Sequence, residues 1–401
     1  MEMADENQQQ EAHVLIFPCP LQGHITAMLR LAEALSFADG FIISFLNTEH
    51  NNRLLNRFSL RPNFRFLSIP DGLPEDCPRS LPHITELLNS LRTHSIDYFH
   101  SLLLAGGRRD PNGWPPVTCL IVDGVLPFAM DAAQALGIPV IVFQTISASA
   151  LWICVRFPQM IQAGELPFPG GRKQIFSDAD LDELIKSVPA MESYLRRRDL
   201  PSMCRKATEA EDEELQLFAN ISATSMRSKA LIINSSNSLE ASILSRIRSI
   251  SPNTYAVGPL HAVVESITSS SISSSLLGED CSALSWLDSQ PDRALRRLYQ
   301  LWQPRTADAG RVSGVVARVR RQRSPVLVGG KVGLGGWWSS GVEDGRVGGE
   351  NKTGGVGATG GGPAAPCGGL LLYAQRVEFN VGECSCRGAN GVLAEVVGSV
   401  G

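Results

Sequence analysis

The sequence lacks several features that define common classes of protein. No stretch approaches the roughly 20 uninterrupted apolar residues of a membrane helix, and the first ten residues (MEMADENQQQ) are acidic and polar, unlike a secretory signal. Positive charge shows no excess, since 36 Lys and Arg face 40 Asp and Glu, which argues against a nucleic-acid partner. The nine cysteines lack the spacing of a zinc site or a disulfide framework. We therefore expect a cytoplasmic protein without a membrane span.

Isoleucine disappears part-way along the chain. Residues 1–293 contain 23 isoleucines and 13 glycines, whereas residues 294–401 contain no isoleucine and 24 glycines. A Gly-rich segment of this kind buries little apolar surface and cannot easily offset its chain entropy. We therefore expect residues 294–401 to form a disordered Gly/Arg-rich tail, and residues 1–11 to form a disordered N-terminus.

The first 293 residues alternate between apolar β-rich runs and segments with helical spacing. Buried strands are predicted at residues 13–18, 41–46, 64–69, 117–122, 140–143 and 230–233. The segments of helical spacing predict helices at residues 25–35, 84–104, 128–136 and 239–250. This βαβα order predicts an α/β fold with a doubly wound, Rossmann-like parallel sheet, which binds ligands beyond the carboxyl ends of its strands.

Two side chains with acid–base chemistry stand at the ends of predicted strands. His24 follows the first strand at the opening of the first helix, and Asp123 ends the fourth strand. In a parallel sheet both ends open onto one crevice, so the imidazole and the carboxylate could meet there. The carboxylate would hold one ring N–H, leaving the other nitrogen to accept a substrate proton. Spacing alone also allows an ordinary alternative, in which His24 starts a helix and Asp123 caps one.

Five short motifs resemble, in order, motifs of the plant family 1 UDP-dependent glycosyltransferases. They are residues 17–24 (FPCPLQGH), 47–50 (NTEH), 69–73 (IPDGL), 255–260 (YAVGPL) and 286–291 (WLDSQP). A further segment, residues 194–201 (YLRRRDLP), is similar to the 7-deoxyloganetic acid glucosyltransferase-like branch of that family. The resemblance covers about residues 12–293.

The resemblance implies a GT-B fold, in which an N-terminal Rossmann-like domain holds the acceptor and a C-terminal one holds the nucleotide sugar. It implies that His24 removes the proton of an acceptor hydroxyl, while Asp123 orients His24 and stabilises its charge. The oxygen then attacks the anomeric carbon of UDP-glucose with inversion, and UDP leaves. Thr145 matches a family position near the donor sugar, and Gln22 lies in the loop that lines the same cleft. UDP-glucose is a co-substrate, no cofactor or metal is implied, and we expect a monomer.

The acceptor is described only coarsely by the sequence. Phe17, Phe143 and Trp152 are predicted to shape an apolar acceptor pocket, although aromatic residues near strand ends more often belong to the core. The branch resemblance implies a small hydroxylated or carboxylated plant metabolite, terpenoids included.

The resemblance stops after Arg293. The family continues into a strand bearing SFGS and later a donor motif containing HSGWNS, and neither is present as written. With suitable codons, however, the segments beginning at residues 299 and 373 read TSFGSL and THSGWNSTLE one base later. We interpret the tail as the product of a frame error near Arg293, so that the C-terminal Rossmann-like domain is largely missing. The predicted parts are an acceptor domain (12–255), an interdomain connection with the start of the donor domain (256–293), and the tail (294–401).

Two functional interpretations follow from this organisation. The chain is either an inverting glucosyltransferase, or a truncated or frame-shifted product that keeps the acceptor-binding domain without catalysis. A dehydrogenase is a weaker alternative, because the turn after the first strand carries Pro18, Pro20 and only Gly23, where a dinucleotide-binding loop needs spaced glycines.

Overall fold

The computed structural model describes residues 11–55, 61–105, 113–168 and 176–267, together with four strands between residues 297 and 348. These elements fall into two compact units, one containing β1 to α12 and the other containing β8 to β11. The predicted disordered N-terminus (1–11, except Glu11), residues 268–293 of the predicted connection and most of the predicted tail lie outside the described residues.

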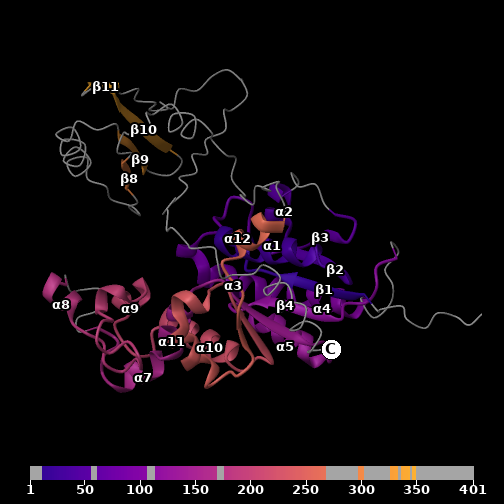
Figure 1. Cartoon of the computed structure of the whole chain (residues 1–401), viewed down its shortest axis with the longest axis horizontal. Helices are drawn as coiled ribbons and strands as arrows, with labels where there is room; N and C mark the ends of the chain where they lie inside the picture. Colours follow the sequence, from indigo (N-terminus) through magenta and orange to yellow (C-terminus); the bar gives the residue numbers. More distant parts are fainter. Residues whose placement is uncertain are drawn as a thin grey trace, which may run out of the picture. The chain divides into compact units, whose positions relative to one another are not determined.

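The first unit is built on a seven-stranded sheet whose strands all run parallel (Figure 1). The spatial order is β3-β2-β1-β4-β5-β6-β7, so the order reverses between the central strands β1 and β4. The strands are β1 (Ala12–Phe17), β2 (Phe41–Thr48), β3 (Phe64–Ile69), β4 (Cys119–Asp123), β5 (Val140–Gln144), β6 (Ala230–Ile233) and β7 (Thr254–Ala256). This arrangement confirms the predicted doubly wound sheet, and the order reverses at β1 and β4, which is where sheets of this kind generally bind ligands.

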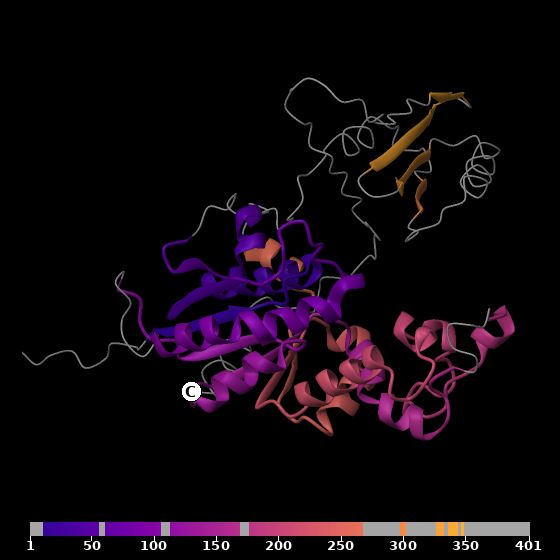
Figure 2. The ribbon, with the colours of Figure 1, turned by 180° about the vertical axis from the view of Figure 1, so that it is seen from behind.

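Helices cover both faces of this sheet, with α1 and α12 on one side and α3, α4 and α5 on the other (Figures 1 and 2). The helices are α1 (Gln22–Ser36), α2 (Glu49–Leu55), α3 (Ile84–His94), α4 (Ile96–Ala105), α5 (Pro127–Ala135), α6 (Ala148–Val155), α7 (Phe157–Gln162), α8 (Asp178–Asp182), α9 (Ser202–Lys206), α10 (Glu213–Ser225), α11 (Asn237–Arg248) and α12 (Leu260–Ile267). Two short 3₁₀ helices, η1 (Leu81–His83) and η3 (Arg197–Asp199), complete the described elements of this unit.

Each predicted strand and helix has a counterpart in the structure, whereas β7 and the helices α2, α6, α7, α8, α9, α10 and α12 were not predicted. The helix predicted at residues 84–104 is divided into α3 and α4 at Ser95. The buried Ser95 hydroxyl donates to the carbonyl of Pro70, the residue that follows β3, at 2.6 Å. The short edge strand β7 was not predicted as a strand, because three residues with one side chain fully buried give no periodic signal.

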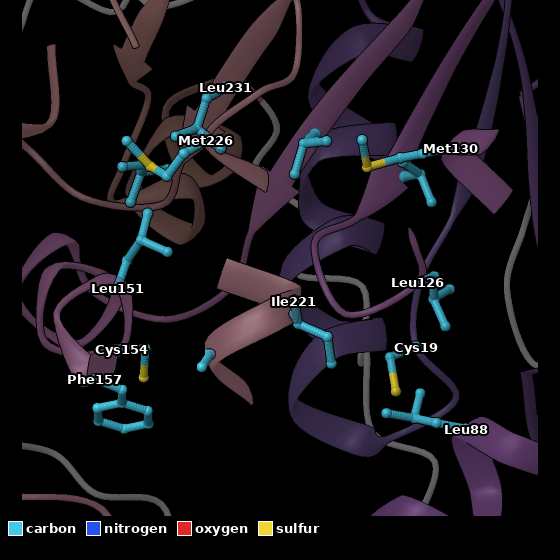
Figure 3. Packing of buried hydrophobic residues seen from close by; sticks show 14 of the residues in the cluster. Cys19, Leu88, Leu126, Met130, Leu151, Cys154, Phe157, Ile221, Met226 and Leu231 are labelled. Carbon is cyan, nitrogen blue, oxygen red and sulfur yellow. The ribbon is translucent and has the colours of Figure 1, made fainter. Parts of the chain in front are cut away.

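The hydrophobic core of the first unit runs along the sheet and under its helices. Part of it is shown in Figure 3, where Cys19, Leu88 and Leu126 lie near one another and Cys154 lies beside Phe157. A separate small cluster joins α1 to α12 through Ala34, Val263 and Val264. The last described helix of this unit therefore closes over the first.

The second unit is a four-stranded sheet in the order β11-β10-β9-β8. Its strands are β8 (Arg297–Leu301), β9 (Val326–Val332), β10 (Gly336–Glu343) and β11 (Arg346–Gly348), of which only β8 and β9 pair in parallel. No helix joins these strands among the described residues, which is consistent with the predicted loss of most of the C-terminal Rossmann-like domain. The structure thus describes strands inside the range expected to be disordered, and the absence of a selected fold in residues 294–401 stays a prediction.

Across the described segments, no helix has both the length and the apolar composition that crossing a bilayer requires.

Candidate functional site

The two predicted acid–base residues meet at the switch point of the sheet. His24 lies in the first turn of α1, directly after β1, and Asp123 is the last residue of β4, the neighbour of β1. His24 Nδ1 lies 2.7 Å from Asp123 Oδ2. The Asp123 side chain is 1% exposed and that of His24 is 20% exposed, so the imidazole alone reaches solvent. The structure thus brings these two side chains together, and their catalytic role stays a prediction.

The contacts of Asp123 define which nitrogen of His24 carries the proton. Oδ2 also accepts from the backbone N–H of Cys19 at 3.1 Å, and Oδ1 accepts from the backbone N–H of Val125 at 3.2 Å. A buried carboxylate that accepts these bonds is an acceptor only, so the 2.7 Å contact requires a proton on His24 Nδ1. The neutral ring therefore carries its lone pair on Nε2, for which the described residues offer no hydrogen bond.

The environment of His24 favours its protonated form. Burial alone would lower the pKa of His24, but the negative charge of Asp123 and the hydrogen bond to it outweigh burial, and the pKa is raised. The pair is thus suited to accept a proton at Nε2 and to hold the resulting imidazolium against Asp123.

Thr145 belongs to the same constellation. Its hydroxyl oxygen lies 3.1 Å from His24 Nδ1, where it is a second acceptor for the Nδ1–H. Gln22, one turn before Thr26 on α1, donates from Nε2 to the Thr26 hydroxyl at 2.8 Å. The structure therefore brings Thr145 to the pair and leaves Gln22 bonded along α1, and a contact of either with a donor sugar stays a prediction.

The three aromatic residues assigned to the acceptor pocket lie inside the core. Phe17 and Phe143 are fully buried and Trp152 is 1% exposed. The Phe17 ring packs against Phe99 at a centroid distance of 5.3 Å, and Trp152 Nε1 donates to a backbone carbonyl at 2.9 Å. As placed, these side chains have no surface for a ligand, and their role in an acceptor pocket stays a prediction.

A glycine that the sequence analysis did not single out shapes the turn after Asp123. A Cβ at Gly124 would lie 2.1 Å from the Gln144 Nε2, which donates to Ser225 Oγ at 2.8 Å, while Ser225 Oγ donates in turn to the Gly124 carbonyl. The Gln144 side chain, at the end of β5, thus packs directly against Gly124, and its hydrogen bond to Ser225 helps to hold the backbone beside Asp123. A Gly directly after a strand-ending Asp was the signal available in the sequence.

The motif at residues 69–73 forms a buried ion pair at the end of β3. Arg79 binds Asp71 through two bonds, Nε to Oδ2 at 3.0 Å and Nη2 to Oδ1 at 2.9 Å, with exposed fractions of 5% and 6% for the two side chains. Arg79 also donates to the carbonyls of Leu73, Pro74 and Cys77. This arginine gathers the loop after β3 around one guanidinium, a geometry that lysine cannot reproduce.

The three successive arginines of residues 194–201 hold the segment that contains α8. Arg196 pairs with Asp182 and Asp199, Arg197 with Glu183 at 2.5 Å, and Arg198 with Asp182 at 2.7 Å. These ion pairs are partly exposed and, through Asp182 and Glu183, join the motif to the end of α8, so the three arginines have partners within the chain itself.

In fold, the chain is similar to plant glycosyltransferases of the GT-B class. A UDP-glucose:anthocyanidin 3-O-glucosyltransferase solved in complex with UDP matches with a TM-score of 0.61 and 21% identity, over 80% of this chain and 67% of that one. The Phytolacca americana enzyme UGT2, solved with UDP-2-fluoroglucose and pterostilbene, matches with a TM-score of 0.57 and 17% identity, over 81% and 66% of the two chains. At these identities the matches show the fold, and they confirm the predicted class.

Sequence relatives make the assignment more specific. A myricetin 3-O-rhamnoside 1,2-glucosyltransferase of Crocosmia x crocosmiiflora is 41% identical over 286 residues, which are 71% of this chain and 58% of the relative. The 7-deoxyloganetic acid glucosyltransferase of Catharanthus roseus is 38% identical over 295 residues, with coverages of 71% and 59%. No known family profile matches the chain. The matched 71% of the chain is homologous to the plant UDP-glycosyltransferases, as its motifs predict, and the chain spans less than two thirds of the length of these relatives.

Proposed function

We propose that the protein descends from an inverting UDP-glycosyltransferase and that His24 is the base that activates the acceptor. The observation that carries the proposal is the buried Asp123 carboxylate at 2.7 Å from His24 Nδ1, with Nε2 on the opposite side of the ring. An acceptor hydroxyl at Nε2 would lose its proton to His24 as its oxygen attacks the anomeric carbon of the UDP-sugar. The bond from that carbon to the UDP oxygen breaks, and inversion follows from attack on the opposite face.

The donor half decides whether this chemistry proceeds. His24 and Asp123 lie in the first unit, while the groups that would hold the nucleotide sugar are expected in the C-terminal Rossmann-like domain. Positioning of two reactants contributes about 7–11 kcal/mol to such a reaction. A chain that binds acceptor but does not position UDP-glucose would therefore show negligible turnover.

The proposed substrates follow the matched relatives. UDP-glucose is proposed as donor, with Thr145 and Gln22 near the sugar, and a small hydroxylated or carboxylated plant metabolite as acceptor. The named relatives act on a flavonol rhamnoside and on 7-deoxyloganetic acid, a range that leaves the acceptor class broad. We propose a monomer in the cytoplasm that needs no cofactor.

Calorimetry and a transfer assay test the proposal. The 401-residue chain and a version with the tail read one base later are titrated with UDP and incubated with UDP-glucose and a panel of terpenoid and flavonoid acceptors. We expect UDP binding and transfer from the re-read version only. His24→Ala in that version should abolish transfer and leave the UDP affinity within about twofold, since the base does not hold the nucleotide. Equal loss of both properties would contradict the assignment of His24 as base.

A non-catalytic remnant is the second candidate, favoured by the loss of family motifs after Arg293. Sequencing of the mature transcript across the codons for Ser289 to Leu301 separates the two candidates. A transcript in the family frame makes the product a complete glycosyltransferase. A transcript that encodes the chain as written makes it an acceptor-binding remnant.

A further inference from the structure

A carboxylate from a distant helix holds the start of α6. Glu240 Oε2 accepts from the backbone N–H of Ala148 at 3.0 Å and from Ser235 Oγ at 2.5 Å. Its Oε1 accepts from the backbone N–H and the hydroxyl of Ser149, at 2.8 and 2.5 Å. Both oxygens are therefore engaged, and together they join the N-terminus of α6 to the segment between β6 and α11.

The backbone of α11 is distorted at the residue that delivers this carboxylate. Glu240 has φ −131° and ψ 31° inside a segment that is otherwise helical, so its side chain leaves the direction that a regular first turn would give it. Burial alone would raise the pKa of Glu240, but the hydrogen bonds from Ser149, Ser235 and the Ala148 amide outweigh it and lower the pKa. An ionised carboxylate at the N-terminus of α6 also interacts favourably with the helix dipole.

The anchored residues lie close to the acid–base pair in sequence. Thr145 is separated from Ala148 by Ile146 and Ser147, and Ser147 itself caps α6 by accepting from the Ala150 N–H at 3.1 Å. On the other side, Gln144 ends β5, with its side chain bonded to Ser225. The β5–α6 loop therefore runs between two fixed points, and Thr145 is the residue of this loop that contacts His24.

We propose that Glu240 is a positioning residue, which fixes the β5–α6 loop so that the Thr145 hydroxyl stands at His24 Nδ1. In that place the hydroxyl oxygen shares the Nδ1–H with Asp123, opposes rotation of the ring and keeps Nε2 directed away from the carboxylate. The effect of Glu240 on the position of Thr145 concerns the folded first unit alone. The consequence for proton abstraction by His24 rests on the proposed function.

Glu240→Gln tests the proposal in the full chain, without donor or acceptor. Each oxygen of Glu240 now accepts from one backbone N–H and one serine hydroxyl. The NH₂ group of glutamine cannot accept from a backbone N–H, so at least one of these hydrogen bonds is lost with little change of volume. We expect the amide protons of Ala148 and Ser149 to exchange about tenfold faster or more, in line with the loss of charge-assisted hydrogen bonds. We also expect the pKa of His24, measured by NMR titration of its ring nitrogens, to fall, because an acceptor that favours the imidazolium is withdrawn. The matched control is Glu265→Gln on the exposed surface of α12, which should change neither readout.

A second variant separates positioning from general loosening. Thr145→Val should lower the pKa of His24 in the same direction, and Glu240→Gln should add nothing on that background. Faster exchange at Ala148 and Ser149 with an unchanged His24 titration would overturn the proposal, as would an effect of Glu240→Gln that persists in Thr145→Val. If Glu240→Gln does not fold, Ser149→Ala removes part of the anchor and should give smaller shifts of the same sign. If the version with the tail read one base later shows this coupling but transfers no sugar, the proposed function is refuted and the positioning role stays intact.

Discussion

Asp123→Asn is the substitution that examines the site most directly. The change keeps the shape of the side chain and removes one acceptor oxygen and the charge. If the amide nitrogen replaces Oδ2, it faces the Cys19 N–H and the His24 Nδ1–H, and if it replaces Oδ1, it faces the Val125 N–H. In the first orientation two donors lose their carboxylate acceptor, of which His24 keeps Thr145, and in the second orientation one donor does, so at least one buried backbone N–H is left unpaired. The alternative is that His24 moves its proton to Nε2, which destroys the lone pair proposed to act as base.

The magnitude follows from these contacts and depends on pH. A buried donor left without a partner costs about 1–3 kcal/mol, and the hydrogen bond between ionised partners contributes about 1.5–3 kcal/mol where His24 is protonated. Because the pKa of His24 is raised in the folded protein, its stabilising effect is fully present below the unfolded pKa of about 6.5 and is lost as pH rises through the folded pKa. We expect Asp123→Asn to lower the free energy of unfolding by about 2–4 kcal/mol at pH 6 and by about 1–3 kcal/mol at pH 9.

Urea denaturation followed by far-UV circular dichroism measures both values. The control is the same substitution in a His24→Gln background, where position 24 no longer titrates and the cost should be the same at both pH values. A cost that is independent of pH with His24 present, or dependent on pH with His24 absent, would refute the coupling of stability to this pair.

Three further predictions concern other parts of the first unit. Gly124→Ala should cost about 1–3 kcal/mol of unfolding free energy in the same urea assay, because its Cβ meets Gln144, whereas Gly23→Ala meets nothing within 4 Å and should be neutral. Arg79→Lys, in the buried pair with Asp71, should lower the free energy of unfolding by about 2–4 kcal/mol and speed proteolysis of the loop after β3. Arg53→Lys, in an exposed pair, should change it by no more than about 0.5 kcal/mol. Equal losses of stability in the two variants would contradict the role of burial. Among the five described cysteines, the half-buried Cys77 should be alkylated first by iodoacetamide at pH 8, as measured by peptide mass spectrometry. Burial raises the pKa of Cys119, Cys154 and Cys204 to about 12 and that of Cys19 well above its usual value, so these four thiols should react more slowly.

The sheet was predictable because its strands carry their own signal. β1 and β4 are buried on both faces, so they read as continuous apolar runs, and their order with the helices sets the topology. The pairing of His24 with Asp123 was predictable for the same reason, since both follow from the ends of neighbouring strands. Ser95 shows the limit of such reasoning, because the residue between α3 and α4 bonds a carbonyl 25 residues away, which no local pattern indicates.

The supporting residues of the site were not predictable from local pattern. Glu240 lies in a segment with helical spacing, and nothing in its neighbourhood indicates that its carboxylate serves Ala148 and Ser149, more than 90 residues earlier. Thr145 was placed near the donor sugar by resemblance, whereas its contact with His24 appears only when β5 is set beside β4. Long-range hydrogen bonds of this kind depend on the completed fold.

Synthesis from the N-terminus gives the contact between α12 and α1 a role in timing. The apolar stripe around Ala34 is made early, yet Val263 and Val264, which cover it, leave the ribosome only after all seven strands of the first sheet. Domains generally fold as units during synthesis, the N-terminal unit first. Arrival of α12 is therefore the step after which the nascent first unit exposes little apolar surface on this face. We expect chaperone dependence to fall at that length of chain, whatever sequence is translated afterwards.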